Sequence, residues 1–163
     1  LTHEGTEVVR SRLPVTDALR YTDLRQDGTV EVWVGLTREG FDFSGSANLV
    51  ATKISDHAGA TALAAKGTLV AAFVAVTQIA NGTTSDVISI AKDGTPTAKL
   101  CGDCTITLAD CTNKVGSVFM LMPVTGANAV IDPASEDIYA VADASATRSA
   151  GKVYILLVFQ KTA

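Results

Sequence analysis

The sequence has 163 residues, of which 47% are apolar, 18% charged and 6% aromatic, and its formal net charge is −4. A chain of this length can bury a core as one domain without metal or disulfide support. Its acidic balance argues against nucleic acid as the main partner, since phosphate binding needs a basic face. No run approaches the ~20 apolar residues of a transmembrane helix, so we expect no membrane partner either. No charged segment followed by an apolar one opens the sequence, and we infer no secretory signal in it.

The low charge calls for an explanation. Charged residues are fewer than the roughly 25% of an average soluble protein, and the mean hydropathy is +0.28. Between Phe43 and Ser85 only Lys53, Asp56 and Lys66 carry charge. Two interpretations fit: a β-protein rich in core residues, or a domain that buries outer surface against neighbouring subunits.

Residues 1–29 combine mixed charge with isolated apolar positions, which predicts an extended N-terminal arm. Thr16 and Asp17 are suited to cap a short helix that reaches Leu24. Arginine is concentrated in the first quarter of the chain, where its guanidinium groups can pair with acidic surfaces in a bidentate manner. The remainder, residues 30–163, shows no linker or composition break and is predicted to form a single domain.

A strand begins at Val30, because apolar residues alternate with others through Leu36. Trp33 falls on the otherwise polar face of this strand. An isolated exposed tryptophan is common at interfaces, but the N-terminal segment could equally cover it. Residues 38–47 are predicted to be a loop that contains Phe41 and Phe43.

The longest apolar stretch lies between Gly67 and Gly94. A run from Thr68 to Ala80 is followed by Asn81-Gly82, a dipeptide that tolerates the positive φ angles of a tight turn. A second apolar run over residues 87–90 completes the pattern. We predict a β-hairpin here.

Further short strands follow at turn-punctuated intervals, over residues 48–54, 104–108, 115–122, 129–131, 138–142 and 152–161, with one accessory helix over 58–66. Residues 115–122 are predicted to be a buried strand, and 152–161 is apolar enough to be central in its sheet. The sequence therefore predicts an all-β fold: an antiparallel β-sandwich, most simply a jelly roll, with at most one or two short helices.

Three cysteines form the nearest approach to a motif, Cys101, Cys104 and Cys111. A zinc site would need a fourth ligand from His57, Asp103 or Asp110, none at a diagnostic spacing. A redox-active pair normally opens a helix, whereas this one enters a strand. Ordinary cysteines in a turn, or one disulfide with a thiol left over, are the other readings. We predict no metal and no cofactor.

No pattern indicates catalysis. His57 follows Ser55 and Asp56 directly, but catalytic triads assemble through space and no nucleophile elbow occurs. Phosphate-binding and dinucleotide-binding loops are not found in the sequence either. We expect a protein that is not an enzyme.

The second half of the chain resembles a known family in the order of its segments. A polar loop over 80–85 leads to DVISIAKDG, then to VGSVFMLM and EDIYAVADAS, and SAGKVYILLVFQK ends the pattern. This order is similar to that in capsid decoration (cement) proteins of tailed bacteriophages and related virion accessory proteins. The resemblance spans roughly Gly67 to Lys161, and neither the cysteines nor the arginine-bearing N-terminal segment belongs to it.

This resemblance implies a structural protein on the capsid surface of a virion, which binds the major capsid protein, acts as a homotrimer and stabilises the shell. Neighbour contacts are then expected from arm arginines and exposed aromatic anchors, namely Arg10, Arg12, Arg20, Arg25, Trp33, Phe41 and Phe43. The alternative is a receptor- or carbohydrate-binding β-sandwich of a viral fibre or adhesin. Sugar sites usually display several aromatic platforms, and here the single tryptophan and the scattered tyrosines disfavour one.

Overall fold

The computed structural model describes residues 18–24, 30–44, 49–55, 66–78, 85–106, 115–144 and 150–161, and within 18–24 and 30–39 it describes the backbone.

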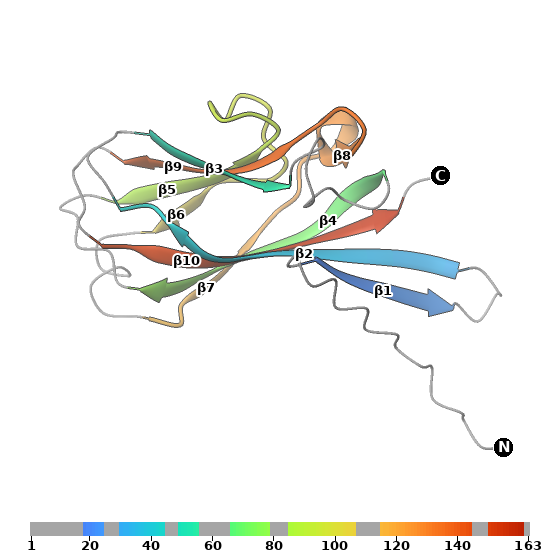
Figure 1. The fold of residues 1–163 in the computed structure, drawn as a ribbon, viewed down its shortest axis with the longest axis horizontal. Coiled ribbons are helices and arrows are strands. Elements are labelled where there is room, and N and C mark those ends of the chain that lie inside the picture. Colours follow the sequence, from blue (N-terminus) through green and yellow to red (C-terminus); the bar gives the residue numbers. More distant parts are fainter. Residues whose placement is uncertain are drawn as a thin grey trace, which may run out of the picture.

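Two antiparallel β-sheets pack face to face (Figure 1). In the larger sheet the strands lie in the order β1–β2–β10–β4–β7, and β8 also pairs with β4. Its strands are β1 (Ala18–Leu24), β2 (Val30–Asp42), β4 (Gly67–Gln78), β7 (Val118–Leu121), β8 (Val130–Ile131) and β10 (Lys152–Lys161). The smaller sheet has the order β3–β9–β5–β6, with β3 (Leu49–Ser55), β9 (Ile138–Ala144), β5 (Asp86–Ala91) and β6 (Cys104–Ile106). A single-turn 3₁₀ helix, η1 (Gly126–Ala129), precedes β8. The predicted all-β sandwich is confirmed.

The strand connections wind as a jelly roll. Strand β5 pairs with β6, β4 with β7, β3 with β9 and β2 with β10, all antiparallel. In the sequence, each of these pairs encloses the pair named before it, with β5 and β6 innermost and β2 and β10 outermost. The polypeptide is therefore a nested series of long hairpins that spans both sheets. Eight strands wound in this way are the defining feature of a jelly roll. Strand β1 adds to the outer edge of β2.

The core lies between the sheets and follows from the two-residue period of the strands. On β10 every second residue from Val153 to Phe159 is at most 1% exposed. Ile88 and Ile90 on β5, with Ile138 on β9, meet them from the smaller sheet. Burying each such side chain stabilises the fold by about 1.5–3 kcal/mol. Strand β10 lies between β2 and β4, as its apolar sequence predicted.

The predicted hairpin over 67–94 is wrong, because β4 and β5 belong to different sheets. Strand β4 pairs with β10 and β7, and β5 pairs with β9 and β6. Both strands bury apolar residues on the face toward the same core, Val74 and Val76 from one side and Ile88 and Ile90 from the other. Burial on opposite walls of the core therefore decides their arrangement, and the Asn81-Gly82 dipeptide lies outside the described residues.

Two predictions near the N-terminus are also corrected. Residues 18–24 form a strand instead of a short helix, in register with β2 from Ala18↔Leu36 to Leu24↔Val30. Pairing with β2 gives the backbone of this segment a ladder of hydrogen bonds, whereas an isolated short helix is only marginally stable. Strand β2 then continues to Asp42, through part of the segment predicted to be a loop. The predicted arm over 1–29 thus contributes one strand to the larger sheet, and the rest of it is outside the described residues.

Most other predicted strands are present with shifted ends. Residues 152–161 match β10, whereas 104–108 and 115–122 shorten to β6 and β7. The accessory helix predicted over 58–66 falls almost entirely outside the described residues. In the parts of the chain that the structure describes, no helix is long and apolar enough to cross a membrane.

Candidate functional site

Strand β7 and its flanks expose an unusual amount of apolar surface. Among the described residues five large apolar side chains are exposed, and only Leu49 lies outside this segment; the other four are Val115, Val118, Met120 and Met122. Leu121 points into the core and Phe119 packs against it, so Val118, Met120 and Met122 alternate with them on the outer side. These three side chains are 64%, 67% and 72% exposed.

The apolar surface continues across the larger sheet. Met120 lies opposite Phe73 on β4, which in turn lies opposite Leu156 on β10. The next row runs from Val118 to Ala75 and on to Tyr154. Residues directly opposite in an antiparallel pair share one face of the sheet, with Cβ atoms about 4.5–5.5 Å apart. We call this surface the outer apolar face; it consists of Phe73, Ala75, Val118, Met120, Met122, Tyr154 and Leu156.

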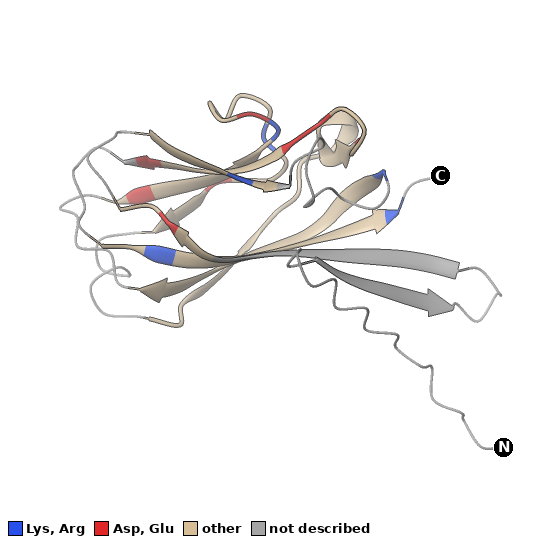
Figure 2. Cartoon of the chain, in the orientation of Figure 1, with Lys and Arg blue, Asp and Glu red and all other residues tan. Residues whose placement is uncertain are grey.

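Charge is absent from the strands that carry this face. Strands β4 and β7 contain no charged residue, and β10 has only a lysine at each end. Figure 2 shows the described charges elsewhere, on the smaller sheet, on its loops and at the strand ends. In Figure 1 no other described strand or helix lies against the outer side of the larger sheet. A large apolar surface of this kind on a folded domain marks a site of interaction.

The outer side of the smaller sheet is different, because the chain covers it. Ser89, Ala91 and Val141 alternate with core residues and point away from the core, yet they are at most 2% exposed. The loop over residues 92–100 rises on this side of the sheet (Figure 1). At Gly94 it passes so close that an added Cβ would lie 3.6 Å from that of Ala51.

Asp93 holds this loop in shape. One carboxylate oxygen accepts hydrogen bonds from the amides of Thr95 and Thr97 at 3.1 and 3.0 Å. The other accepts from the Thr97 hydroxyl at 2.6 Å and the Ala98 amide at 3.0 Å. These bonds, the Thr97 hydroxyl first, lower the pKa of Asp93. The loop over the smaller sheet is therefore held in place by specific hydrogen bonds. No loop of this kind covers the larger sheet in the residues that the structure describes.

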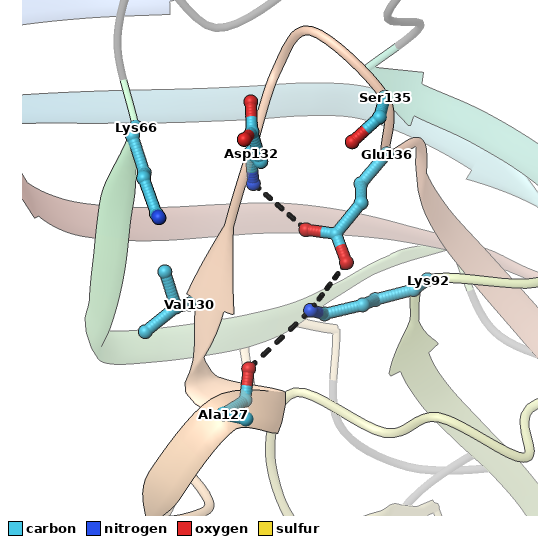
Figure 3. A pocket seen from close by; sticks show the side chains of 7 residues that line it. All are labelled: Lys66, Lys92, Ala127, Val130, Asp132, Ser135 and Glu136. Carbon is cyan, nitrogen blue, oxygen red and sulfur yellow. Dashed lines mark hydrogen bonds and ion pairs between the residues drawn. The ribbon is translucent and has the colours of Figure 1, made fainter.

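A pocket of about 440 Å³ opens where β4 begins, beside η1 (Figure 3). Several of its polar side chains interact with other groups of the pocket. The Lys92 ammonium contacts a Glu136 carboxylate oxygen at 2.7 Å and the Ala127 carbonyl at 3.4 Å. The other Glu136 oxygen accepts the Asp132 amide at 2.7 Å. The lining, completed by Lys66, Val130 and Ser135, contains no aromatic side chain.

Two of the three cysteines lie in the core. Cys101 and Cys104 are both buried and are not joined by a disulfide. Burial, with a smaller effect from the charge of Asp103, raises the pKa of the Cys101 thiol to about 12. Asp103 itself is paired with Lys99 at 2.6 Å and accepts the Ser89 hydroxyl at 2.7 Å. Within the described residues no three metal-ligating side chains gather, and Cys111, His57 and Asp110 lie outside them.

The structure places the expected interface residues as follows. Phe41 and Phe43 are 1% and 0% exposed and belong to the core, so they are not the surface anchors that we expected. Phe41 points inward because β2 carries one extra residue between Arg38, opposite Ile155, and Phe41, opposite Val153; Phe41 therefore shares the face of the buried Val153. Arg20 and Trp33 lie on the neighbouring strands β1 and β2, where the backbone alone is described. Arg10, Arg12 and Arg25 fall outside the described residues.

The outer apolar face was not foreseen as a site. The sequence predicts a buried strand over VGSVFMLM, because apolar residues occupy both faces, and this prediction is wrong for Val118, Met120 and Met122. That pattern does carry a signal: a strand that is apolar on both faces can pack one face on the core of its own domain and leave an apolar face for another partner. What the pattern lacks is the position of β7 at the end of the described sheet.

Comparison of the sequence with protein-family models found no match. Searches of curated proteins and of solved structures likewise found none.

Proposed function

We propose that this chain is a structural protein that acts by binding other subunits, and specifically a capsid decoration protein that stabilises the outer surface of a virion shell. The observation that carries the proposal is the outer apolar face. A sandwich that covers one sheet with its own loop and leaves the other apolar is suited to bury that second surface in an assembly.

The fold is compatible with this role and with other functions. Jelly rolls build viral capsid proteins and also lectin domains, and a fold by itself assigns no function. The resemblance of Gly67 to Lys161 to decoration proteins of tailed bacteriophages points to the first of these classes. The major capsid protein is then the partner, and three copies of the chain assemble at each site.

The mechanism is binding linkage. A protein that binds the assembled shell but not its separated subunits raises the free energy of rupture by RT ln(1 + [L]/Kd) for each binding site, where [L] is its free concentration. Apolar surface contributes about 25 cal/mol for each Å² removed from water. The methionines of β7 suit such a contact, because their unbranched side chains adapt to an irregular partner surface.

The direct test is co-sedimentation with empty capsids of the phage that encodes the chain. We expect the protein to pellet with the shells at a fixed ratio and to raise their melting temperature. Met122→Lys, on the outer apolar face, should lower the occupancy, whereas Leu49→Lys on the smaller sheet should not. Shells that neither bind the protein nor melt at a higher temperature would rule out the decoration role.

The receptor- or carbohydrate-binding alternative has one feature in its favour, the pocket beside η1. Its polar groups could meet hydroxyl groups of a sugar, but none of its described walls offers an aromatic platform. A glycan array tests this function. Binding by the unchanged chain that Glu136→Gln weakens would support it, and a blank array would exclude the glycans tested.

A further inference from the structure

The pocket beside η1 contains polar groups that its own residues leave unused. Lys92 and Glu136 form an ion pair in it, and Glu136 also accepts the Asp132 amide. Among the described residues, no hydrogen bond or ion pair reaches the Lys66 ammonium, the Ser135 hydroxyl or the Oδ2 atom of Asp132. These three groups line a space of about 440 Å³, which is within the usual range for small-molecule sites.

The turn that carries Asp132 is held in shape by its own hydrogen bonds. The Asp132 carbonyl accepts the amides of Ser135 and Glu136 at 3.1 and 2.8 Å. Its Oδ1 atom accepts the Ala134 amide at 3.0 Å, and the ring of Pro133 fixes the backbone between them. A ligand therefore meets a carboxylate that is already in position, and little conformational entropy is lost on binding.

Strand pairing brings two opposite charges to the same part of the pocket. The last pair of β4 and β8 is Gly67↔Ile131. Lys66 and Asp132 are the next residues of the two segments, and both line the pocket (Figure 3). They form no ion pair with each other. An ammonium and a carboxylate are thus available close together, each without a charged partner among the described residues.

The charges around the pocket distinguish between possible ligands. Its lining carries two lysines and two acidic residues, so its formal net charge is zero. Lys92 and Glu136 neutralise each other, which leaves the charges of Lys66 and Asp132 for a ligand. A simple anion is repelled by the acidic side chains and a simple cation by the lysines. A molecule that carries both charges meets an opposite charge at each end.

We propose that this pocket binds a small zwitterion of the α-amino acid type. The ligand carboxylate pairs with the Lys66 ammonium and accepts the Ser135 hydroxyl, while the ligand ammonium pairs with Oδ2 of Asp132. Val130, in the same lining, gives apolar contact to a short aliphatic side chain. Charge-assisted hydrogen bonds are roughly twice as strong as neutral ones, so the pocket prefers a zwitterion to a sugar. This inference goes beyond the decoration role, since none of these residues belongs to the outer apolar face.

A titration of the whole chain with L-alanine, followed by NMR of the backbone amides of residues 126–136, tests the site. We expect saturable shifts with a dissociation constant of about 1–10 mM. Propionate and ethylamine each lack one charge of L-alanine and should bind at least about five-fold more weakly. Shifts that do not saturate by about 100 mM would overturn the proposal. D-glucose that binds as tightly as L-alanine would also overturn it.

Two variants assign the charges. Lys66 is exposed, and asparagine at position 132 can still accept the Ala134 amide, so Lys66→Met and Asp132→Asn should both fold. Lys66→Met should remove the advantage of L-alanine over ethylamine, and Asp132→Asn its advantage over propionate. Lys152→Met removes the same charge at the other end of β10 and should leave binding unchanged.

The results separate charge recognition from a structural disturbance and from the decoration role. A variant that weakens all three probes alike, or one that leaves L-alanine binding unchanged, would overturn the assignment. A chain that binds shells but not L-alanine would keep the decoration role and lose this site. A chain that binds L-alanine but not shells would keep this site and lose the decoration role.

Discussion

Gly151, just before β10 begins, and Phe43, just after β2 ends, are in direct contact. The Phe43 amide donates a hydrogen bond of 3.1 Å to the Gly151 carbonyl. A Cβ at position 151 would lie 2.6 Å from Cε2 of the Phe43 ring, closer than real Cβ atoms come to any neighbour. Gly151 also has a φ of +152°, which side-chain-bearing residues rarely adopt. The position of the buried Phe43 ring therefore requires a residue without a side chain at position 151.

Replacing Gly151 with alanine should be strongly destabilising. The added methyl must displace either a fully buried ring or the backbone that precedes β10, and overpacking of this kind costs about 1–3 kcal/mol before backbone strain is added. We expect the free energy of unfolding to fall by about 2–4 kcal/mol in urea denaturation. Gly102→Ala is the matched control, because its nearest neighbour would be the Met122 carbonyl oxygen at 3.8 Å. Equal stability of the two variants would contradict the contact.

Asp93→Ala should loosen the loop that covers the smaller sheet. Four hydrogen bonds are lost, from Thr95, Thr97 and Ala98, and we expect a cost of about 1–2 kcal/mol near neutral pH. Amide hydrogen exchange over residues 92–100 should accelerate. Asp143→Ala, an exposed position on β9, should cost less than about 0.5 kcal/mol.

The same carboxylate gives a pH dependence of defined sign. The pKa of Asp93 is lowered in the folded protein from its usual 3.8, chiefly by the Thr97 hydroxyl, so the folded chain retains the carboxylate at lower pH than the unfolded chain does. Its contribution is complete above pH 3.8 and disappears as the pH falls through the lower folded value. The stability difference between Asp93→Ala and the unchanged chain should therefore be constant near neutrality and shrink in acid. A difference that grows in acid would contradict this assignment.

The buried thiols should be unreactive in the native state. In a Cys111→Ser background only Cys101 and Cys104 remain, and the pKa of the Cys101 thiol is raised to about 12 by burial. The thiolate, not the thiol, attacks iodoacetamide and displaces iodide, so mass spectrometry at pH 8 should show little modification of the folded chain. After unfolding in guanidinium both cysteines should react. Rapid labelling of the native chain would mean that this part of the core opens.

Local patterns in the sequence predict many of the strands. The alternation from Val153 to Phe159 identifies a strand with one fully buried face, and the structure has it with the predicted bounds of β10. Which strands pair is a different matter. The Asn81-Gly82 dipeptide is a local turn signal, whereas the pairing of β4 with β10 joins residues about 80 positions apart and depends on the summed burial of the whole core.

The residues of the candidate site could not be predicted for the same reason, because their exposure depends on contacts between distant parts of the chain. The aromatic side chains of Phe41 and Phe43 in a predicted loop suggest surface anchors, but β2 extends through this segment with one extra residue opposite β10, and both rings are buried in the core. The sequence predicts Val118, Met120 and Met122 to be buried, because nothing in their own segment shows that β7 is the last of the described strands in its sheet. Exposure at an edge is set by topology, so the outer apolar face emerges only once the strand order is known.

The ion pair between Lys92 and Glu136 should stabilise the connection from β8 to β9. It ties the end of β5 to residues 127–136, and the Lys92 side chain is only 15% exposed. Lys92→Met leaves Glu136 with its bond to the Asp132 amide but without a cation, and we expect a loss of about 1–2 kcal/mol. A double-mutant cycle with Glu136→Gln should give a coupling near 1 kcal/mol. The exposed pair of Lys152 and Asp42, 3.7 Å apart, is the control and should couple by less than about 0.5 kcal/mol. Equal coupling in the two pairs would mean that the partial burial of Lys92 contributes nothing to the strength of its ion pair.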